Sequence, residues 1–124
     1  MKKLLICICI LLLVFNTNAN DYIFSRISVE KGLSCTQVQT IIQDRKGFIW
    51  VGTSDGLNRF DGFSFKNFLP IPGNPKSIQA NNITNLYEDS SGNIWIIFMS
   101  GEISVYNPFM NEFLNFSSLT LKKY

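Results

Sequence analysis

The residues that could support chemistry in this chain are few, and most of them fall at turns. The sequence contains no histidine, so Cys35 has no imidazole to activate it as a nucleophile. Asp44, Asp55 and Asp89 are each followed by glycine within three positions, and aspartate in such turns commonly bonds the backbone. We therefore interpret Cys35 as a small, half-buried residue and the aspartates as turn residues rather than acids or metal ligands. No catalytic residue, metal ligand or cofactor is predicted.

Trp50 and Trp95 occupy one position of an internal repeat. Residues 38–50 recur as residues 83–95, and in both segments an aspartate is followed by glycine after three positions and by tryptophan after six. The displacement of 45 positions is typical of the blades of a propeller. Both tryptophans lie in the most apolar run of their repeat, so we interpret them as residues that pack between blades rather than as platforms for sugar rings.

Each repeat predicts four antiparallel strands joined by tight turns. The expected strands cover residues 36–43, 48–53, 57–60 and 63–68 in the first repeat and 82–88, 93–98, 102–106 and 112–116 in the second. Several are apolar on both faces, as in a sheet enclosed between neighbouring sheets. We predict type I turns with a bulge at the two repeated aspartates, and primed hairpin turns at Asp55-Gly56 and Asp61-Gly62. The predicted fold class is all-β, with two four-stranded antiparallel blades of an incomplete propeller.

The first residues predict export from the cytoplasm. Lys2 and Lys3 precede the apolar run Leu4–Phe15, and the small residue Ala19 ends the polar stretch that follows. We expect a signal peptide over residues 1–19, cleaved after Ala19. An uncleaved anchor is the alternative, although the run is shorter than the roughly 20 residues that cross a bilayer as a helix. The mature chain would carry nine basic and nine acidic side chains and one cysteine, which favours neither nucleic-acid binding nor an intrachain disulfide.

The rest of the chain divides at its turns and at a proline-rich segment. We predict a lone N-terminal strand within residues 20–31, formed by Tyr22–Val29 and able to close a ring of blades. The first blade covers residues 32–69, an inter-blade loop residues 70–76 and the second blade residues 77–116, and residues 117–124 start a following segment. Because blades are stable in longer arrays, we expect a truncated or partial propeller.

These repeats resemble the two-component regulator propeller repeats. The similar residues are Gly32-Leu33-Ser34, Gly47–Thr53 and Asp55–Gly62 in the first repeat, and Ser77-Ile78, Gly92–Trp95 and Tyr106–Pro108 in the second. The second repeat departs from the pattern at Ile97-Phe98, where the family and the first repeat have Gly-Thr, and by one extra residue after Gly101. We therefore expect an irregular hairpin there.

The resemblance implies the N-terminal part of the ligand-sensing propeller of a hybrid two-component histidine kinase. Such a receptor sits in the inner membrane with this part in the periplasm, and many members sense oligosaccharides. The implied partners are an oligosaccharide for the complete receptor, further propeller blades and a second receptor chain as a homodimer. The membrane would be reached only through downstream segments. The kinase and other catalytic modules of the family are absent from this sequence, so no enzymatic activity is expected, and the ligand-binding residues are unknown.

Two other functions remain open at this point. A secreted propeller enzyme acting on carbohydrate, either a glycoside hydrolase or a lyase, would need paired carboxylates or a metal-binding cluster. The nine acidic residues do not cluster outside turn positions. A purely structural secreted repeat protein is the third possibility, because a fold does not by itself fix a function.

Overall fold

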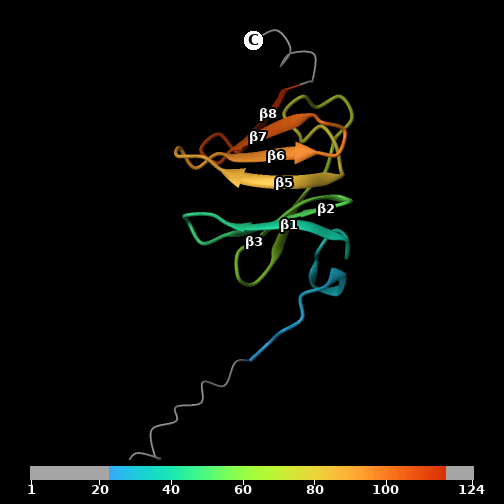
Figure 1. The fold of residues 1–124 in the computed structure, drawn as a ribbon, viewed down its shortest axis with the longest axis vertical. Coiled ribbons are helices and arrows are strands. Elements are labelled where there is room, and N and C mark those ends of the chain that lie inside the picture. Colours follow the sequence, from blue (N-terminus) through green and yellow to red (C-terminus); the bar gives the residue numbers. More distant parts are fainter. Residues whose placement is uncertain (1–22, 117–124) are drawn as a thin grey trace, which may run out of the picture.

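The computed structural model describes residues 23–116, which form two four-stranded antiparallel sheets stacked face to face (Figure 1). The first sheet contains β1 (Val38–Gln43), β2 (Ile49–Thr53), β3 (Gly56–Phe60) and β4 (Phe65–Phe68) in that order. The second contains β5 (Ile83–Glu88), β6 (Ile94–Phe98), β7 (Ile103–Asn107) and β8 (Glu112–Phe116). The predicted all-β blade architecture is confirmed. The predicted signal peptide and the segment 117–124 lie outside the described residues.

Each strand predicted for the two blades is present, with its ends within two residues of the expected ones. The turns decide these ends. Gly47 and Gly92 adopt φ values of 87° and 81°, and their N–H groups donate to the carbonyls of Asp44 and Asp89 at 2.9 and 3.1 Å. The type I turns with a bulge are therefore confirmed, and glycine is needed because only it takes this left-handed backbone freely.

The primed turns predicted at the two Asp-Gly pairs are wrong. Gly56 and Gly62 have positive φ, but Asp55 and Asp61 do not, whereas a type I′ turn needs positive φ at both central residues. Side-chain hydrogen bonds explain the difference. The Asp61 carboxylate accepts the backbone N–H groups of Phe63 and Ser64 at 2.8 and 2.7 Å, and the Thr53 hydroxyl accepts the N–H of Asp55 at 3.1 Å.

The lone strand predicted over Tyr22–Val29 is not formed in its described part. Residues 23–28 are irregular, and Val29–Lys31 form a single 3-10 turn (η1) closed by Gly32 at a φ of 101°. A strand is stabilised by the ladder it makes with a neighbour. This segment pairs with no strand between residues 23 and 116, so no ladder hydrogen bonds stabilise an extended conformation of it.

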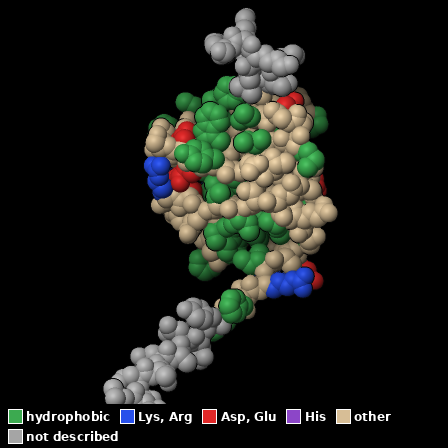
Figure 2. Space-filling view, viewed as in Figure 1, with side chains coloured by type: hydrophobic (Ala, Val, Ile, Leu, Met, Phe, Trp, Pro, Cys, Tyr) green, Lys and Arg blue, Asp and Glu red, His purple; other side chains and the backbone are tan. Residues whose placement is uncertain are grey.

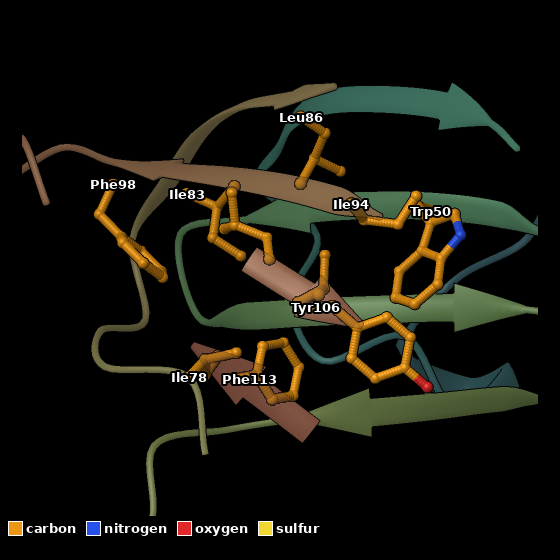
Figure 3. Close-up of a cluster of buried hydrophobic side chains, with 10 residues drawn as sticks. Trp50, Ile78, Ile83, Leu86, Ile94, Phe98, Tyr106 and Phe113 are labelled. Atoms are coloured by element: carbon orange, nitrogen blue, oxygen red, sulfur yellow. The ribbon is translucent and has the colours of Figure 1, made fainter. Parts of the chain in front are cut away.

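The core lies between the two sheets and is mostly aliphatic and aromatic. Its buried members are Trp50, Leu57, Ile78, Ile83, Leu86, Ile94, Ile96, Phe98, Tyr106 and Phe113. Figure 3 shows the Trp50 indole directed toward the Tyr106 ring, and their centroids are 5.2 Å apart. Phe68 adds a ring from β4, 5.8 Å from Trp50 and 5.4 Å from Phe113. One aromatic cluster therefore joins the two sheets.

The sheets approach most closely at Gly52. A Cβ built on Gly52 would lie 2.6 Å from Cγ2 of Ile83 in the opposite sheet and 2.6 Å from Cγ2 of Thr40. Real side chains do not tolerate such distances, so any larger residue would push the sheets apart. Gly52 is therefore required by packing rather than by its backbone angles.

Only one of the two repeated tryptophans is buried between the sheets. Trp50 is 1% exposed and Trp95 is 37% exposed, so the prediction that both pack between blades is confirmed for Trp50 and stays a prediction for Trp95, which no further blade adjoins among residues 23–116. Successive residues of a strand point to opposite faces. In β6, Ile94 and Ile96 face the first sheet, and Trp95 therefore points away from it, where no third sheet lies among residues 23–116.

Candidate functional site

A polar cleft opens where the β1–β2 and β5–β6 turns lie side by side. Its volume is about 510 Å³. Its walls are residues 44–46 from the first sheet, Glu88 and residues 90–92 from the second, and Pro108 and Phe109 from the β7–β8 turn, with Trp50 and Ile94 also lining it. The β1–β2 and β5–β6 turns both follow the Asp-x-x-Gly pattern, and the stacking of the two sheets places them side by side.

Arg45 connects the two walls of this cleft. Its backbone N–H donates to both carboxylate oxygens of Glu88, at 3.1 and 3.3 Å. Its guanidinium donates to the carbonyl oxygens of Ser90 at 2.9 Å and Asp89 at 3.0 Å. The guanidinium of Arg45 and the carboxylate of Glu88 approach to 3.9 Å, with 62% and 15% of the side chains exposed. Such an exposed pair contributes little stability by itself, but it fixes where the cleft presents its charges.

The repeated aspartates organise the turns behind the cleft. Asp44 accepts the N–H groups of Lys46 and Phe48, and its second oxygen accepts the indole N–H of Trp50 at 2.7 Å. Asp89 accepts the indole N–H of Trp95 at 2.9 Å in the same way. The interpretation of these aspartates as turn residues is confirmed. The bond to the tryptophan was not predicted from the sequence, although the six-residue spacing between aspartate and tryptophan recurs in both repeats.

Hydrogen bonding holds the Asp89 carboxylate in its charged form. The indole N–H of Trp95 and the side-chain amide of Asn93 lower the pKa of Asp89 from 3.8 to about 2. Hydrogen bonds from these donors stabilise the charged carboxylate more than the neutral acid, and this lowers the pKa. A carboxyl group held in this way is a poor general acid near neutral pH, which supports its structural role.

An exposed aromatic ring stands beside the cleft. Phe109 is 95% exposed at the tip of the β7–β8 turn, and Phe63 is 96% exposed at the equivalent tip between β3 and β4. Asn107 positions the first of these tips by accepting two backbone N–H groups, at 2.9 and 3.0 Å. Phe109 lines the cleft and Phe63 does not. Neither residue was predicted from the sequence, although both repeats place a phenylalanine two residues after the Asp61 or Asn107 that begins this turn.

Cys35 and Asp55 lie away from the cleft and are not brought together into a site. The Cys35 thiol is half-buried, 3.3 Å from the Ser54 hydroxyl, and also accepts the backbone N–H of Gln37. The Ser54 hydroxyl contributes most to lowering the pKa of Cys35, and the Gln37 N–H adds to it. Between residues 23 and 116 no three histidine, cysteine, aspartate or glutamate side chains gather as a metal site would require.

The cleft is suited to binding rather than to covalent chemistry. It combines two cations (Arg45, Lys46), two carboxylates, serine hydroxyls and the edge of an aromatic ring. A few convergent polar groups next to an aromatic side chain are typical of sites that bind small polar molecules. The carboxylates nearest to it are already engaged by hydrogen bonds in the turns.

Among the helices of the described residues, none is long and apolar enough to span a membrane.

Comparison with known proteins identifies the repeats. Residues 32–55 and 77–97 match the family described as two component regulator propeller. A histidine kinase designated P4, from Formosa agariphila, is 42% identical over 59 residues, which are 48% of this chain and 4% of the kinase.

A solved structure shares the fold. The crystal structure of an extracellular domain assigned to a hybrid two component system, from B. thetaiotaomicron, superposes with a TM-score of 0.71 at 31% identity. The match covers 78% of this chain and 14% of that domain. The chain therefore spans only a small part of the length of both proteins.

Proposed function

Because this chain carries two repeats of the two component regulator propeller family, we propose that it forms part of the extracytoplasmic sensor of a hybrid histidine kinase. The observation that carries the proposal is the double match at residues 32–55 and 77–97, combined with the fold of an extracellular domain from such a system. The role assigned here is ligand sensing rather than catalysis. The predicted signal peptide would place the domain in the periplasm.

We further propose that the sensed molecule is an oligosaccharide and that the polar cleft contributes to its binding. Sugars offer many hydroxyl groups together with apolar ring faces, so they suit a site that joins charged and hydroxyl groups to an aromatic ring. Arg45 and Lys46 supply donors on one side, and the exposed ring of Phe109 supplies an apolar surface on the other.

The test is calorimetric titration of the complete protein with a panel of neutral and acidic oligosaccharides. Phe109→Ala should lower the affinity by about tenfold, as expected for an aromatic contact at the edge of a binding site. Phe63→Ala is the matched control, because the same residue type at the equivalent turn lies outside the cleft. Absence of binding to any oligosaccharide would contradict the proposed ligand, and equal effects of the two variants would contradict the assignment of the cleft.

A further inference from the structure

A second cavity lies between the two sheets, on the side of β4 and β8 and away from β1 and β5. Its volume is about 220 Å³, and it is lined by β4, the loop that follows β4 and the β7–β8 turn. Its polar lining includes Lys66, Asn74, Lys76, Ser77 and Asn111 and contains no carboxylate. We call this cavity the lysine groove. It is formed entirely by the two described sheets and their loops, so it does not depend on what covers their outer faces.

Lys66 brings a positive charge to the groove that no carboxylate balances. It stands opposite Arg59 in the register of β3 and β4, and like charges at opposite positions destabilise a sheet. Among residues 23–116, no carboxylate oxygen lies within 4 Å of the nitrogen atoms of Lys66 or Arg59. On the face shown in Figure 2, by contrast, the blue cationic side chains adjoin red acidic ones. An anion bound beside Lys66 would offset this repulsion.

The free hydrogen-bonding groups of the groove are mainly donors. Oδ1 of Asn74 accepts the backbone N–H of Lys76 at 3.0 Å, and Oδ1 of Asn111 accepts the Tyr106 hydroxyl at 2.8 Å and Nζ of Lys66 at 3.3 Å. The Nδ2 groups of both asparagines donate no hydrogen bond to residues 23–116. Each lysine ammonium uses one of its three N–H donors in that part of the chain. Two amides and two ammonium groups therefore retain donors for a ligand.

The other polar side chains of the groove are bonded within the protein. The Ser77 hydroxyl accepts the backbone N–H of Ile71 at 3.0 Å and donates to the carbonyl of Asn74 at 2.9 Å. The Asn67 amide donates to the carbonyl of Gly32 at 3.0 Å, on the opposite face of β4 from Lys66. The groove thus presents positive charge and N–H donors. The group that complements such a surface has only acceptors and a negative charge, as a carboxylate or a sulfate ester does.

We propose that the lysine groove binds a negatively charged group, a carboxylate or a sulfate ester, carried by one unit of an oligosaccharide. That the ligand is a sugar rests on the proposed function. The groove is smaller than the 300–1,000 Å³ typical of whole ligand pockets, so it suits a single charged unit of a longer molecule. The β7–β8 turn lines both cavities, with Phe109 in the polar cleft and Asn111 in the groove. One acidic oligosaccharide would therefore occupy both.

Glu112 limits the positive charge of the groove. Its carboxylate lies 2.7 Å from Nζ of Lys76, with 39% and 63% of the two side chains exposed, although Glu112 itself does not line the groove. Removing the charge of Glu112 would release the Lys76 ammonium and remove a repulsion on the bound anion. Glu112→Gln should therefore strengthen binding of the acidic ligand, whereas Lys66→Gln should weaken it.

The first test compares oligosaccharides that differ only in charge, by calorimetric titration of the complete protein. Oligogalacturonates are compared with their methyl esters, and sulfated galactan oligosaccharides with their desulfated forms. In one pair or both, the charged form should bind about tenfold more tightly, as expected for charge-assisted hydrogen bonds. The difference should shrink as the salt concentration rises. The pair that shows the larger difference tells a carboxylate site from a sulfate site.

The second test repeats these titrations with three variants. Lys66→Gln should remove most of the preference for the charged form, and Glu112→Gln should raise the affinity for that form severalfold. Lys31→Gln is the matched control, because this exposed lysine of η1 lines neither the groove nor the cleft. The affinity for the neutral forms should be the same in all three, since only the charged group contacts the lysines. Thermal melting checks that each variant folds.

Equal affinity for the charged and neutral forms of both pairs would overturn this inference and leave the proposed function in place. A preference for the charged form that Lys66→Gln leaves unchanged would also overturn it. If no oligosaccharide binds, the proposed function fails, and inorganic sulfate decides the anion site. At constant ionic strength, sulfate should shift the side-chain amide NMR signals of Asn74 and Asn111 in the unmodified chain but not in Lys66→Gln. Signals that do not move would overturn the site as well.

Discussion

At the scale of single residues, identical positions of the repeat have different environments. Asp44–Trp50 and Asp89–Trp95 make the same hydrogen bond, at 2.7 and 2.9 Å. Trp50 nevertheless lies in the core while Trp95 lies on an open face. The contribution of a repeated residue to the free energy of unfolding therefore depends on how deeply it is buried and not on its place in the repeat.

Alanine substitution should separate the two tryptophans. Trp50→Ala removes a fully buried aromatic side chain and should lower the free energy of unfolding by about 3–5 kcal/mol. Trp95→Ala empties no enclosed space in the described structure, so the expected loss is about 1 kcal/mol. Denaturant titration at a concentration where the chain is monomeric would measure both. Equal losses would show that the Trp95 face is covered.

The Asp89 carboxylate should make the stability of the fold depend on acid. Its pKa in the folded chain is about 2, below the ordinary value of 3.8, so the charged form stabilises the folded state. This contribution is complete above the ordinary value and is lost as the pH falls through about 4 toward 2. Urea unfolding should therefore show a larger loss over this range for the unmodified chain than for Asp89→Asn. An identical loss in both would assign the acid sensitivity to other groups, such as Asp61.

At the scale of elements, turns fix the strand ends and a single glycine fixes the distance between sheets. The β2–β3 loop consists of two residues, whereas the β6–β7 turn is longer and is closed by Gly101 at a φ of 83°. The extra residue is absorbed in this turn, because Ile97 and Ile103 remain in register. The irregular hairpin expected at this place is therefore a longer turn between regular strands.

Gly52→Ala tests the close approach of the sheets. The added methyl group would lie 2.6 Å from Ile83 and from Thr40, so the variant should lose about 1–3 kcal/mol of unfolding free energy through overpacking. Thermal or denaturant unfolding would measure the loss. In an Ile83→Ala background part of this cost should disappear, because one of the two clashing atoms is removed. A cost independent of Ile83 would place the strain within the first sheet alone.

At the scale of the whole molecule, the two sheets form one core but leave an apolar face at each end. The edge strands β1 and β5 contact each other across the interface, and the turns at one end of the strands form the polar cleft (Figure 1). The cleft reaches the core through Trp50 and Ile94, which belong to both. The apolar faces point along the stacking direction, and the charged turns point to one side.

Export is a prediction about the whole chain that the described residues do not test. The basic residues Lys2 and Lys3, the apolar run Leu4–Phe15 and the small residue Ala19 predict cleavage between Ala19 and Asn20. Amino-terminal sequencing of secreted material should begin at Asn20. Material that retains Leu4–Phe15 would indicate an uncleaved anchor.

The sequence by itself determined the strands of the two blades, the repeat and the turn positions of Asp44 and Asp89, because these follow from local chemistry. A glycine at positive φ, an aspartate bonding nearby backbone N–H groups and a short apolar run bounded by turns act within a few residues. Only the tertiary structure decided which tryptophan is buried, why Gly52 has no side chain and how Arg45 meets Glu88. Each depends on the face that a residue presents to the other sheet, 43 positions away for Arg45 and Glu88. The N-terminal strand was mispredicted for the same reason, since its residues favour β structure but a strand also needs a partner.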